Sequence, residues 1–306
     1  SLVGSEMCIR DSGGTLGSLI QKINDLGVKF GIWIEPEMIS EDSDLYREHP
    51  DWALTIPGRN PVHARNQLVL DFSRKEVVDH IFDQICKVLD QGNIEYVKWD
   101  MNRSLMDVFS RGTKDQGRVM YDYVIGLYDF LERIVTRYPD LLIEGCSDNT
   151  DALDRLQIQY GTSFGYPISA VGSHVSAVPN HQTGRITSLH TRGVVAMAGT
   201  FGYELNLGKL SEEEKEEIRS QVEEYRKFAP LIQTGLYYRL SDPSKEEYAA
   251  WAFVSEDQKE VLLNVVMQEI HGNMTVNYVN LQGLKCSAVY RDTETGKTYN
   301  GAALME

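Results

Sequence analysis

The most constraining feature of the sequence is a regular alternation of short apolar runs and longer amphipathic stretches from about residue 14 to residue 235. The short runs VKFGIWIE, IEYVKW, LLIEGC and GTFGYEL are rich in β-branched and aromatic residues, which is typical of buried strands. Stretches such as RKEVVDHIFDQICKVLDQG have apolar residues at helical spacing. Strands separated by helices predict a parallel sheet with helical crossovers. We expect four strands in one such sheet, with C-terminal ends at Glu35, Asp100, Cys146 and Tyr203.

The pattern changes after about residue 235. YAAWAFVSED, EVLLNVVMQ, MTVNYVNL and CSAVYRDTETGKTY alternate or are β-branched and are separated by turn residues, which predicts a small antiparallel β domain. The first stretch, SLVGSEMCIRDS, has neither helical nor strand periodicity, and we expect it to be non-native. The predicted division is therefore a leader over 1–12, a β/α domain over 13–235 and a β domain over 236–306.

Charge and composition restrict the classes of partner. The chain has 30 Lys and Arg against 45 Asp and Glu, a net charge of −15, which argues against nucleic acid and anionic membranes as partners. No run approaches the roughly 20 apolar residues of a transmembrane helix. The four cysteines form no CxxC motif and no dense framework, which favours free thiols in a reducing compartment, and we predict a cytoplasmic protein.

Acidic residues follow several predicted strands. Glu35 and Glu37 come after one, Asp100 ends another, and Asp148 and Asp151 lie in SDNTD after a third. In a β/α barrel catalytic groups lie at the C-terminal ends of strands, and two carboxyl groups beside aromatic rings suggest cleavage of a glycosidic bond. Other readings remain open, because a strand-end aspartate also serves as a helix N-cap or a salt-bridge partner.

The alternatives for individual residues are structural. Glu35 and Glu37 are expected to fix their loop. For Trp33 the alternative is a place in the core, and for Cys146 it is the role of a small buried apolar group. Either Thr150 or Asp148 is a candidate N-cap for the helix that follows SDNTD. His174 and His181 are seven positions apart with no carboxylate in register, so we predict no metal site, and no motif indicates a cofactor.

Several long motifs, taken in order, resemble one family. KFGIWIEPEMIS, RNQLVLDFSR, YVKWDMNRS, SDNTDALDRLQIQYGTSFGYP, GSHVSAVPNHQTGR and GTFGYEL closely resemble the bacterial α-galactosidases of glycoside hydrolase family 36. The resemblance runs from about Gly14 to the C-terminus. It implies a (β/α)8 TIM-type barrel with a C-terminal antiparallel β-sandwich, terminal α-galactosides such as melibiose and raffinose as substrates, and a homo-oligomer for an intact member.

The resemblance also implies roles for individual residues. Asp100 matches the nucleophile of a retaining mechanism, and Asp148 matches the acid/base. The positions that match contacts to the sugar are Trp33, Arg65, Lys98, Asn102 and Cys146. A cation such as Lys98 beside Asp100 would favour the ionised form that a nucleophile needs.

The sequence departs from the family pattern in two places. It has no counterpart of the upstream β-sandwich and first two barrel strands, and EGC joins SDNTD directly where the family has a further strand and helix. We therefore expect an incomplete barrel. Three functions follow from the resemblance: an α-galactosidase, a catalytically incompetent fragment that at most binds sugar or associates with intact subunits, and an α-N-acetylgalactosaminidase or α-galactosyl transglycosidase.

Overall fold

The computed structural model describes residues 14–146, 151–273 and 276–306. The leader predicted over 1–12 lies outside the described residues. The chain forms two compact units, Ser1–Ser147 and Asp148–Glu306. Their boundary falls inside the range 13–235 predicted above as one domain, and the predicted domain limits stay a prediction.

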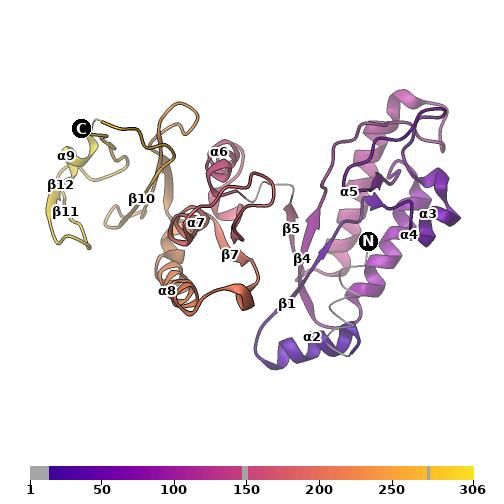
Figure 1. The fold of residues 1–306 in the computed structure, drawn as a ribbon, viewed down its shortest axis with the longest axis horizontal. Coiled ribbons are helices and arrows are strands. Elements are labelled where there is room, and N and C mark those ends of the chain that lie inside the picture. The colour runs from indigo at the N-terminus through magenta and orange to yellow at the C-terminus, as the bar shows by residue number, and fades with distance from the viewer. Residues whose placement is uncertain (1–13, 147–150, 274–275) are drawn as a thin grey trace. The chain divides into compact units, whose positions relative to one another are not determined.

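Over its described residues, 14–146, the first unit contains a three-stranded sheet, the short antiparallel pair β2–β3 and four α-helices (Figure 1). In chain order its elements are α2 (Leu16–Asp25), β1 (Phe30–Ile34), β2 (Met38–Ile39), α3 (Asp44–Glu48), η1 (Pro50–Trp52), β3 (Leu68–Val69), α4 (Lys75–Leu89), β4 (Ile94–Asp100), η2 (Gln116–Arg118), α5 (Val119–Arg137) and β5 (Leu142–Cys146).

Strand β4 lies at the centre of the sheet, with β1 and β5 parallel to it on either side. The register places Trp33 opposite Lys98 and Lys98 opposite Glu144, so these side chains form one row across the three strands. One row further on, Asp100 lies opposite Cys146. Because the strands are parallel and in register, the residues at their C-terminal ends meet along one edge of the sheet.

Side chains alternate along β4 between the two faces of the sheet. Val97 and Trp99 are buried against α4 and α5, whose apolar residues recur at helical spacing. Phe130 of α5 is fully buried and contacts the ring of Trp99 edge-on at 5.2 Å and that of Phe72 at 5.8 Å. This aromatic cluster holds the helices to one face, which leaves the face of Lys98 and Trp33 uncovered by them.

The second unit contains a parallel pair of strands, three long helices and two antiparallel sheets (Figure 1). Its elements are α6 (Ala152–Thr162), η3 (Ile168–Ala170), β6 (Gly172–Ser176), α7 (Leu189–Ala196), β7 (Thr200–Glu204), η4 (Leu207–Lys209), α8 (Glu212–Thr234), β8 (Leu236–Arg239), β9 (Tyr248–Val254), β10 (Val261–Met267), β11 (Val289–Arg291), β12 (Thr298–Asn300) and α9 (Gly301–Met305).

The expectation that four strands form one parallel sheet is wrong for the last of them. Strand β7, which carries Tyr203, pairs with β6 in a separate two-stranded sheet of the second unit. Strand β6 was not among the predicted strands, because its Gly- and Ser-containing stretch has little strand propensity. Pairing with β7 and the buried Val175 compensate for that weak propensity.

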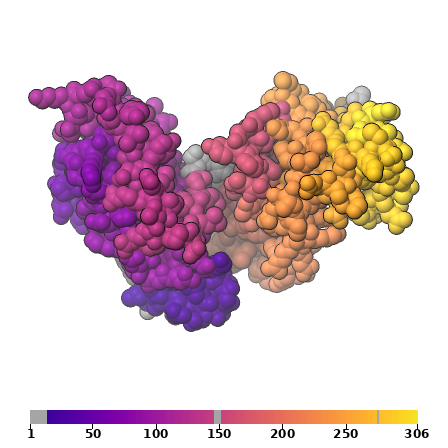
Figure 2. All heavy atoms as spheres, turned by 180° about the vertical axis from the view of Figure 1, so that it is seen from behind, coloured from indigo at the N-terminus to yellow at the C-terminus, as the bar shows by residue number. Residues whose placement is uncertain are grey.

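The C-terminal residues form antiparallel sheets, in order β10–β9–β8 and β11–β12. One expected strand is absent, because residues 276–281 of MTVNYVNL have no strand structure and 274–275 lie outside the described residues. The C-terminal segment, yellow in Figure 2, packs against the orange residues before it. Hydrogen bonds between these segments include one from Gln258 to the Gly283 carbonyl at 2.9 Å and one from Tyr290 to the Gln258 carbonyl at 2.7 Å. Among the described residues, no helix is both long and apolar enough to cross a bilayer.

Replacing Phe130 by Ala should destabilise the first unit by about 3–5 kcal/mol, because the large buried ring leaves a cavity among rigid aromatic neighbours. Urea unfolding followed by tryptophan fluorescence measures the change, since Trp33, Trp52 and Trp99 all belong to this unit. Tyr128→Ala on the same helix is the control, because that side chain is 62% exposed and should cost within about 0.5 kcal/mol. Equal losses for the two variants would contradict the assigned core.

Candidate active site

Asp100 lies at the C-terminal end of β4, and the side chain is only 6% exposed. Its Oδ2 atom accepts a hydrogen bond from Trp33 Nε1 at 3.0 Å and another from Asn102 Nδ2. Its Oδ1 atom is buried and has no hydrogen-bond partner among the described residues. A buried carboxylate oxygen without a partner is unusual in a folded protein. Asp100, Trp33 and Asn102 are thus brought together, and one oxygen of Asp100 is left for a further group.

Glu35 follows β1 directly and is also buried, with 8% of the side chain exposed. Its Oε1 accepts from Asn102 Nδ2 at 2.7 Å, and its Oε2 accepts from Gln67 Nε2 at 3.0 Å. The carboxylate therefore joins the segment after β4 to a second loop. These bonds agree with the loop-fixing role expected for Glu35. No sequence pattern indicated that Gln67 would be its second partner.

Arg65 lies in that second loop, in a tight two-residue turn. Arg65 and Asn66 have φ of 52° and 57°, and Ala64 and Gln67 form a bridge across them. A left-handed pair in a two-residue hairpin is a type I′ turn, which asparagine accepts readily and arginine less so. The Arg65 side chain is exposed. Arg103 Nη1 donates to the Gln67 carbonyl at 2.5 Å and so ties the turn to the segment after β4.

Glu37 has a different environment from Glu35, although it is only two residues away. Its Oε1 accepts from Trp99 Nε1 at 3.0 Å and its Oε2 from the Tyr123 hydroxyl, so it faces the helices of the core. Burial, with the nearby Glu37 carboxylate, raises the pKa of Tyr123 above its ordinary range. The phenol therefore stays protonated and remains a donor to Glu37.

Lys98 lies in the row of residues before Asp100. Its Nζ is 4.0 Å from Glu144 Oε1, and the hydroxyl of Tyr96 lies 2.5 Å from Glu144 Oε2. Glu144, one of the acidic residues at the predicted strand ends, is thus an ion-pair partner of Lys98. Of the other predicted residues, Cys146 is placed by its backbone opposite Asp100, and Asp148 lies outside the described residues.

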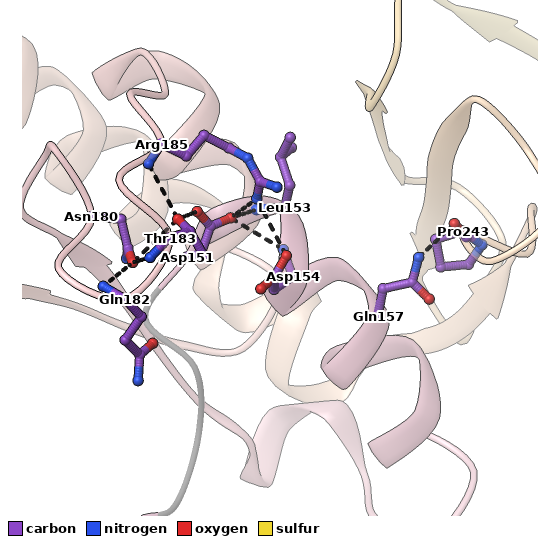
Figure 3. Close-up of polar contacts among 9 residues, drawn as sticks. All are labelled: Asp151, Leu153, Asp154, Gln157, Asn180, Gln182, Thr183, Arg185 and Pro243. Carbon is purple, nitrogen blue, oxygen red and sulfur yellow. Dashed lines mark hydrogen bonds and ion pairs between the residues drawn. The ribbon is translucent and has the colours of Figure 1, made fainter.

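Asp151 is the N-cap of α6, so the expectation of Thr150 or Asp148 in that role is wrong. Its Oδ1 accepts from the backbone N–H of Leu153 at 2.9 Å and bonds to Arg185, while its Oδ2 accepts from Thr183 Oγ1 at 2.7 Å (Figure 3). Burial opposes the charge, but the bonds from Thr183, the α6 backbone and Arg185 outweigh it and hold the pKa below its ordinary value. Asp151 is therefore an ionised structural carboxylate.

His174, one of the two histidines that the sequence analysis considered, belongs to the same unit. It contacts Arg155 at 3.2 Å and Glu204 at 2.9 Å. Within residues 14–146, 151–273 and 276–306, no cluster of three or more His, Cys, Asp or Glu side chains is arranged to hold a metal ion.

Comparison with known proteins places this geometry in a family. The sequence profile of the melibiase family matches residues 6–148 and 146–235, and the profile of the glycosyl hydrolase family 36 C-terminal domain matches residues 248–306. The chain belongs to the melibiase family. This confirms the resemblance to family 36 found in the motifs, and the structural neighbours confirm an α/β fold.

Among the melibiase relatives is the bifunctional alpha-galactosidase/sucrose kinase AgaSK of Mediterraneibacter gnavus, 59% identical over 96% of this chain and 33% of the relative. The alpha-galactosidase Mel36A of Lactobacillus acidophilus is 45% identical over 95% of this chain and 42% of the relative. The galactosidase domain of AgaSK superposes with a TM-score of 0.88, at 58% identity, over 96% of this chain and 43% of that structure.

A further solved relative carries a sugar. The alpha-galactosidase AgaA of Geobacillus stearothermophilus, in complex with raffinose, superposes with a TM-score of 0.87 at 44% identity, over 94% of this chain and 43% of that one. AgaA has also been solved with stachyose. This melibiase chain thus spans between a third and under a half of the relatives it matches.

The melibiase match has an internal break. Its two stretches meet at residues 146–148, where EGC joins SDNTD. The alignment with AgaSK runs over 313 residues although it covers only 96% of this 306-residue chain, so the relative has residues without a counterpart here. Both observations support the internal gap that the motifs indicate.

Asp151→Asn should destabilise the second unit at pH 7 by about 1–2 kcal/mol, because hydrogen bonds to a charged group are weakened. The folded-state pKa of Asp151 lies below the ordinary value of 3.8. Its contribution is therefore present above about pH 4 and is lost as the pH falls through the folded-state pKa, so the two proteins should converge in acid.

Fluorescence of Trp251, the one tryptophan of the second unit, measures the unfolding at pH 7 and in acid. Asp154→Asn is the matched control, since Asp154 lies 3.2 Å from the same Arg185 but is 40% exposed, and should change stability little. A difference between Asp151→Asn and the parent that persists undiminished in acid would refute the assignment.

Proposed function

We propose that the protein is a retaining α-galactosidase that hydrolyses terminal α-galactosides such as melibiose and raffinose-type oligosaccharides. The proposal is supported by membership of the melibiase family and by relatives named alpha-galactosidases, one of them solved with raffinose and stachyose. The absence of a cysteine pairing pattern supports work in a reducing compartment such as the cytoplasm. We further propose that an intact member of the family forms a homo-oligomer.

The observation that carries the proposal is the unequal environment of the two Asp100 oxygens. Oδ2 is held by Trp33 and Asn102, which fixes the plane of the carboxylate, and Oδ1 is buried without a partner. In the first step Oδ1 attacks the anomeric carbon, the bond to the leaving oxygen breaks, and that oxygen takes a proton from Asp148. The product is a galactosyl ester of Asp100.

In the second step Asp148 removes a proton from water, the water oxygen attacks the anomeric carbon from the face that the aglycone left, and the ester bond to Asp100 breaks. Two inversions give retention of configuration. Trp33, with 43% of its side chain exposed, offers a ring face to the sugar, and Arg65, Lys98, Asn102 and Cys146 are assigned to its hydroxyls.

The resemblance implies Asp148 as the proton donor, and the bonding of Asp151 supports that choice over Asp151. Both oxygens of Asp151 are occupied by backbone and side-chain donors, and its lowered pKa leaves it without a proton to give at neutral pH. A general acid needs a pKa raised toward the working pH. Asp148 is the remaining acid of SDNTD before α6.

We also propose an incomplete TIM-type barrel over residues 13–235, followed by a C-terminal antiparallel β-sandwich. The parallel strands with helical crossovers support a barrel, and the break at residues 146–148 supports its incompleteness. The same break favours a second candidate function, a catalytically incompetent chain that binds α-galactosides without cleaving them.

Hydrolysis of 4-nitrophenyl α-galactoside by the purified chain separates the two candidates. Release of nitrophenolate with retention supports the enzyme. Binding of 1-deoxygalactonojirimycin without hydrolysis supports the second candidate, and neither binding nor hydrolysis contradicts both.

Asp100→Gly should abolish turnover, a loss of at least about 10⁴-fold, because the covalent step has lost its nucleophile. Added azide should restore part of the activity and yield β-galactosyl azide, since the small anion enters the space of the carboxylate and attacks from the same face. Asp79→Asn in α4 is the control and should keep the parent rate, because Asp79 pairs with Lys75 and Arg133 and with no predicted site residue. An Asp100→Gly variant with ordinary kinetics would exclude Asp100 as nucleophile.

Asp148→Asn should slow substrates with poor leaving groups far more than 2,4-dinitrophenyl α-galactoside, because a good leaving group needs no proton. The expected difference is about 10²–10⁴-fold in kcat/KM. Asp151→Asn is the comparison, and any loss it causes should be equal for both substrates because its role is structural. If the two variants exchanged these patterns, Asp151 would be the acid.

A further inference from the structure

Glu35 connects two segments that both carry predicted sugar contacts. One oxygen bonds to Asn102 after β4, and the other bonds to Gln67, which closes the turn of Arg65 and Asn66. The carboxylate is buried at 8% exposure, and both of its oxygens have a donor. Hydrogen bonds to a carboxylate are stronger than those between two neutral groups.

The arrangement fixes the orientation of the Asn102 amide. The Nδ2 group of Asn102 donates to Glu35 and to Asp100, and a carboxylate only accepts hydrogen bonds. Turning the amide over would place its carbonyl oxygen against two carboxylates. Asn102 therefore meets both with its N–H groups, and its Oδ1 is the atom it can present to another donor.

The bond to Gln67 acts on the neighbouring turn. Arg65 has a left-handed φ of 52°, which is uncommon outside glycine and asparagine and persists only where the surroundings hold it. Gln67 is pinned by its side chain to Glu35 and by its carbonyl to Arg103. The position of the Arg65 backbone thus depends on the same carboxylate as the orientation of Asn102.

We propose that Glu35 is a positioning residue for the reaction, one that aligns Asp100 through Asn102 and sets the turn of Arg65 through Gln67. This proposal rests on the proposed function for its kinetic consequences. Its structural part stands on the hydrogen bonds alone. Glu35 does not touch the reacting atoms and acts only through its two partners.

Glu37 provides a matched control within the same loop. It is a buried glutamate with two side-chain donors, as Glu35 is, but its donors Trp99 and Tyr123 belong to the core face. Loss of either carboxylate affects stability. Only loss of Glu35 should affect Asn102 and Asp100.

The first test is the indole N–H spectrum of the ¹⁵N-labelled chain, which contains four tryptophans. Trp33 Nε1 shares its acceptor atom with Asn102, and Trp99 Nε1 donates to Glu37. Glu35→Gln should shift the Trp33 resonance and leave that of Trp99 in place, and Glu37→Gln should do the reverse. Trp33→Phe and Trp99→Phe assign the two signals.

The second test is kinetic, on 4-nitrophenyl α-galactoside. Glu35→Gln should lower kcat by about 10²-fold, because a small misplacement of the reacting group costs about that much. Gln67→Leu keeps the Asn102 bond and should mainly raise KM. Glu35→Asp keeps the charge but reaches only one partner, and should recover part of the loss. Glu37→Gln should leave kcat within about threefold of the parent.

The outcomes separate this proposal from the proposed function. If the parent chain shows no hydrolysis, the proposed function fails, and the indole spectra still decide the role of Glu35. An unmoved Trp33 resonance in Glu35→Gln, or equal effects of Glu35→Gln and Glu37→Gln on both signals, overturns the proposal. If Glu35→Gln does not fold, the spectrum of Glu35→Asp is decisive, with the same shift of Trp33 expected and an unmoved signal overturning it.

Discussion

The parallel register of β4 between β1 and β5 is the constraint on which the rest of the first unit depends. It places Trp33, Lys98 and Glu144 in one row and brings Asp100 level with Cys146 in the next. A shift of one residue would turn each side chain of β4 to the opposite face. Trp99 would leave the aromatic cluster around Phe130, so the packing that holds α4 and α5 also fixes where the aspartate lies.

Three buried carboxylates, those of Glu35, Glu37 and Asp100, follow or end strands of this sheet. Burying a charge is costly unless it is paired or hydrogen-bonded, and each of the three has donors of its own. Glu37 has those of the core, Glu35 those of two loops, and Asp100 those of Trp33 and Asn102 on one oxygen only. Asp100 Oδ1 has no such donor among the described residues, and this supports the proposal that it is the nucleophile.

In the second unit, Asp151 shows that an aspartate beside a helix can have a purely structural role. Asp151 caps α6 and bonds to Thr183 and Arg185, which keeps it charged and occupied. These bonds join the start of α6 to residues 183 and 185, which lie more than 30 positions later in the chain. The sequence SDNTD does not indicate which residue is the N-cap of α6, since Ser, Asp, Asn and Thr are all favoured at N-cap positions.

The sequence by itself determined the parallel strands and crossover helices, the later antiparallel strands and the family, because these depend on local periodicity and on long ordered motifs. It indicated Asp100, Trp33 and Asn102 by resemblance. Only the tertiary structure decided that β7 pairs with β6 in a separate sheet, that Glu35 joins Asn102 to Gln67, and that Asp151 is the cap. The physical reason is that these strand partners and side-chain hydrogen bonds join residues from 28 to 67 positions apart, and no local pattern records which distant donor reaches a given carboxylate.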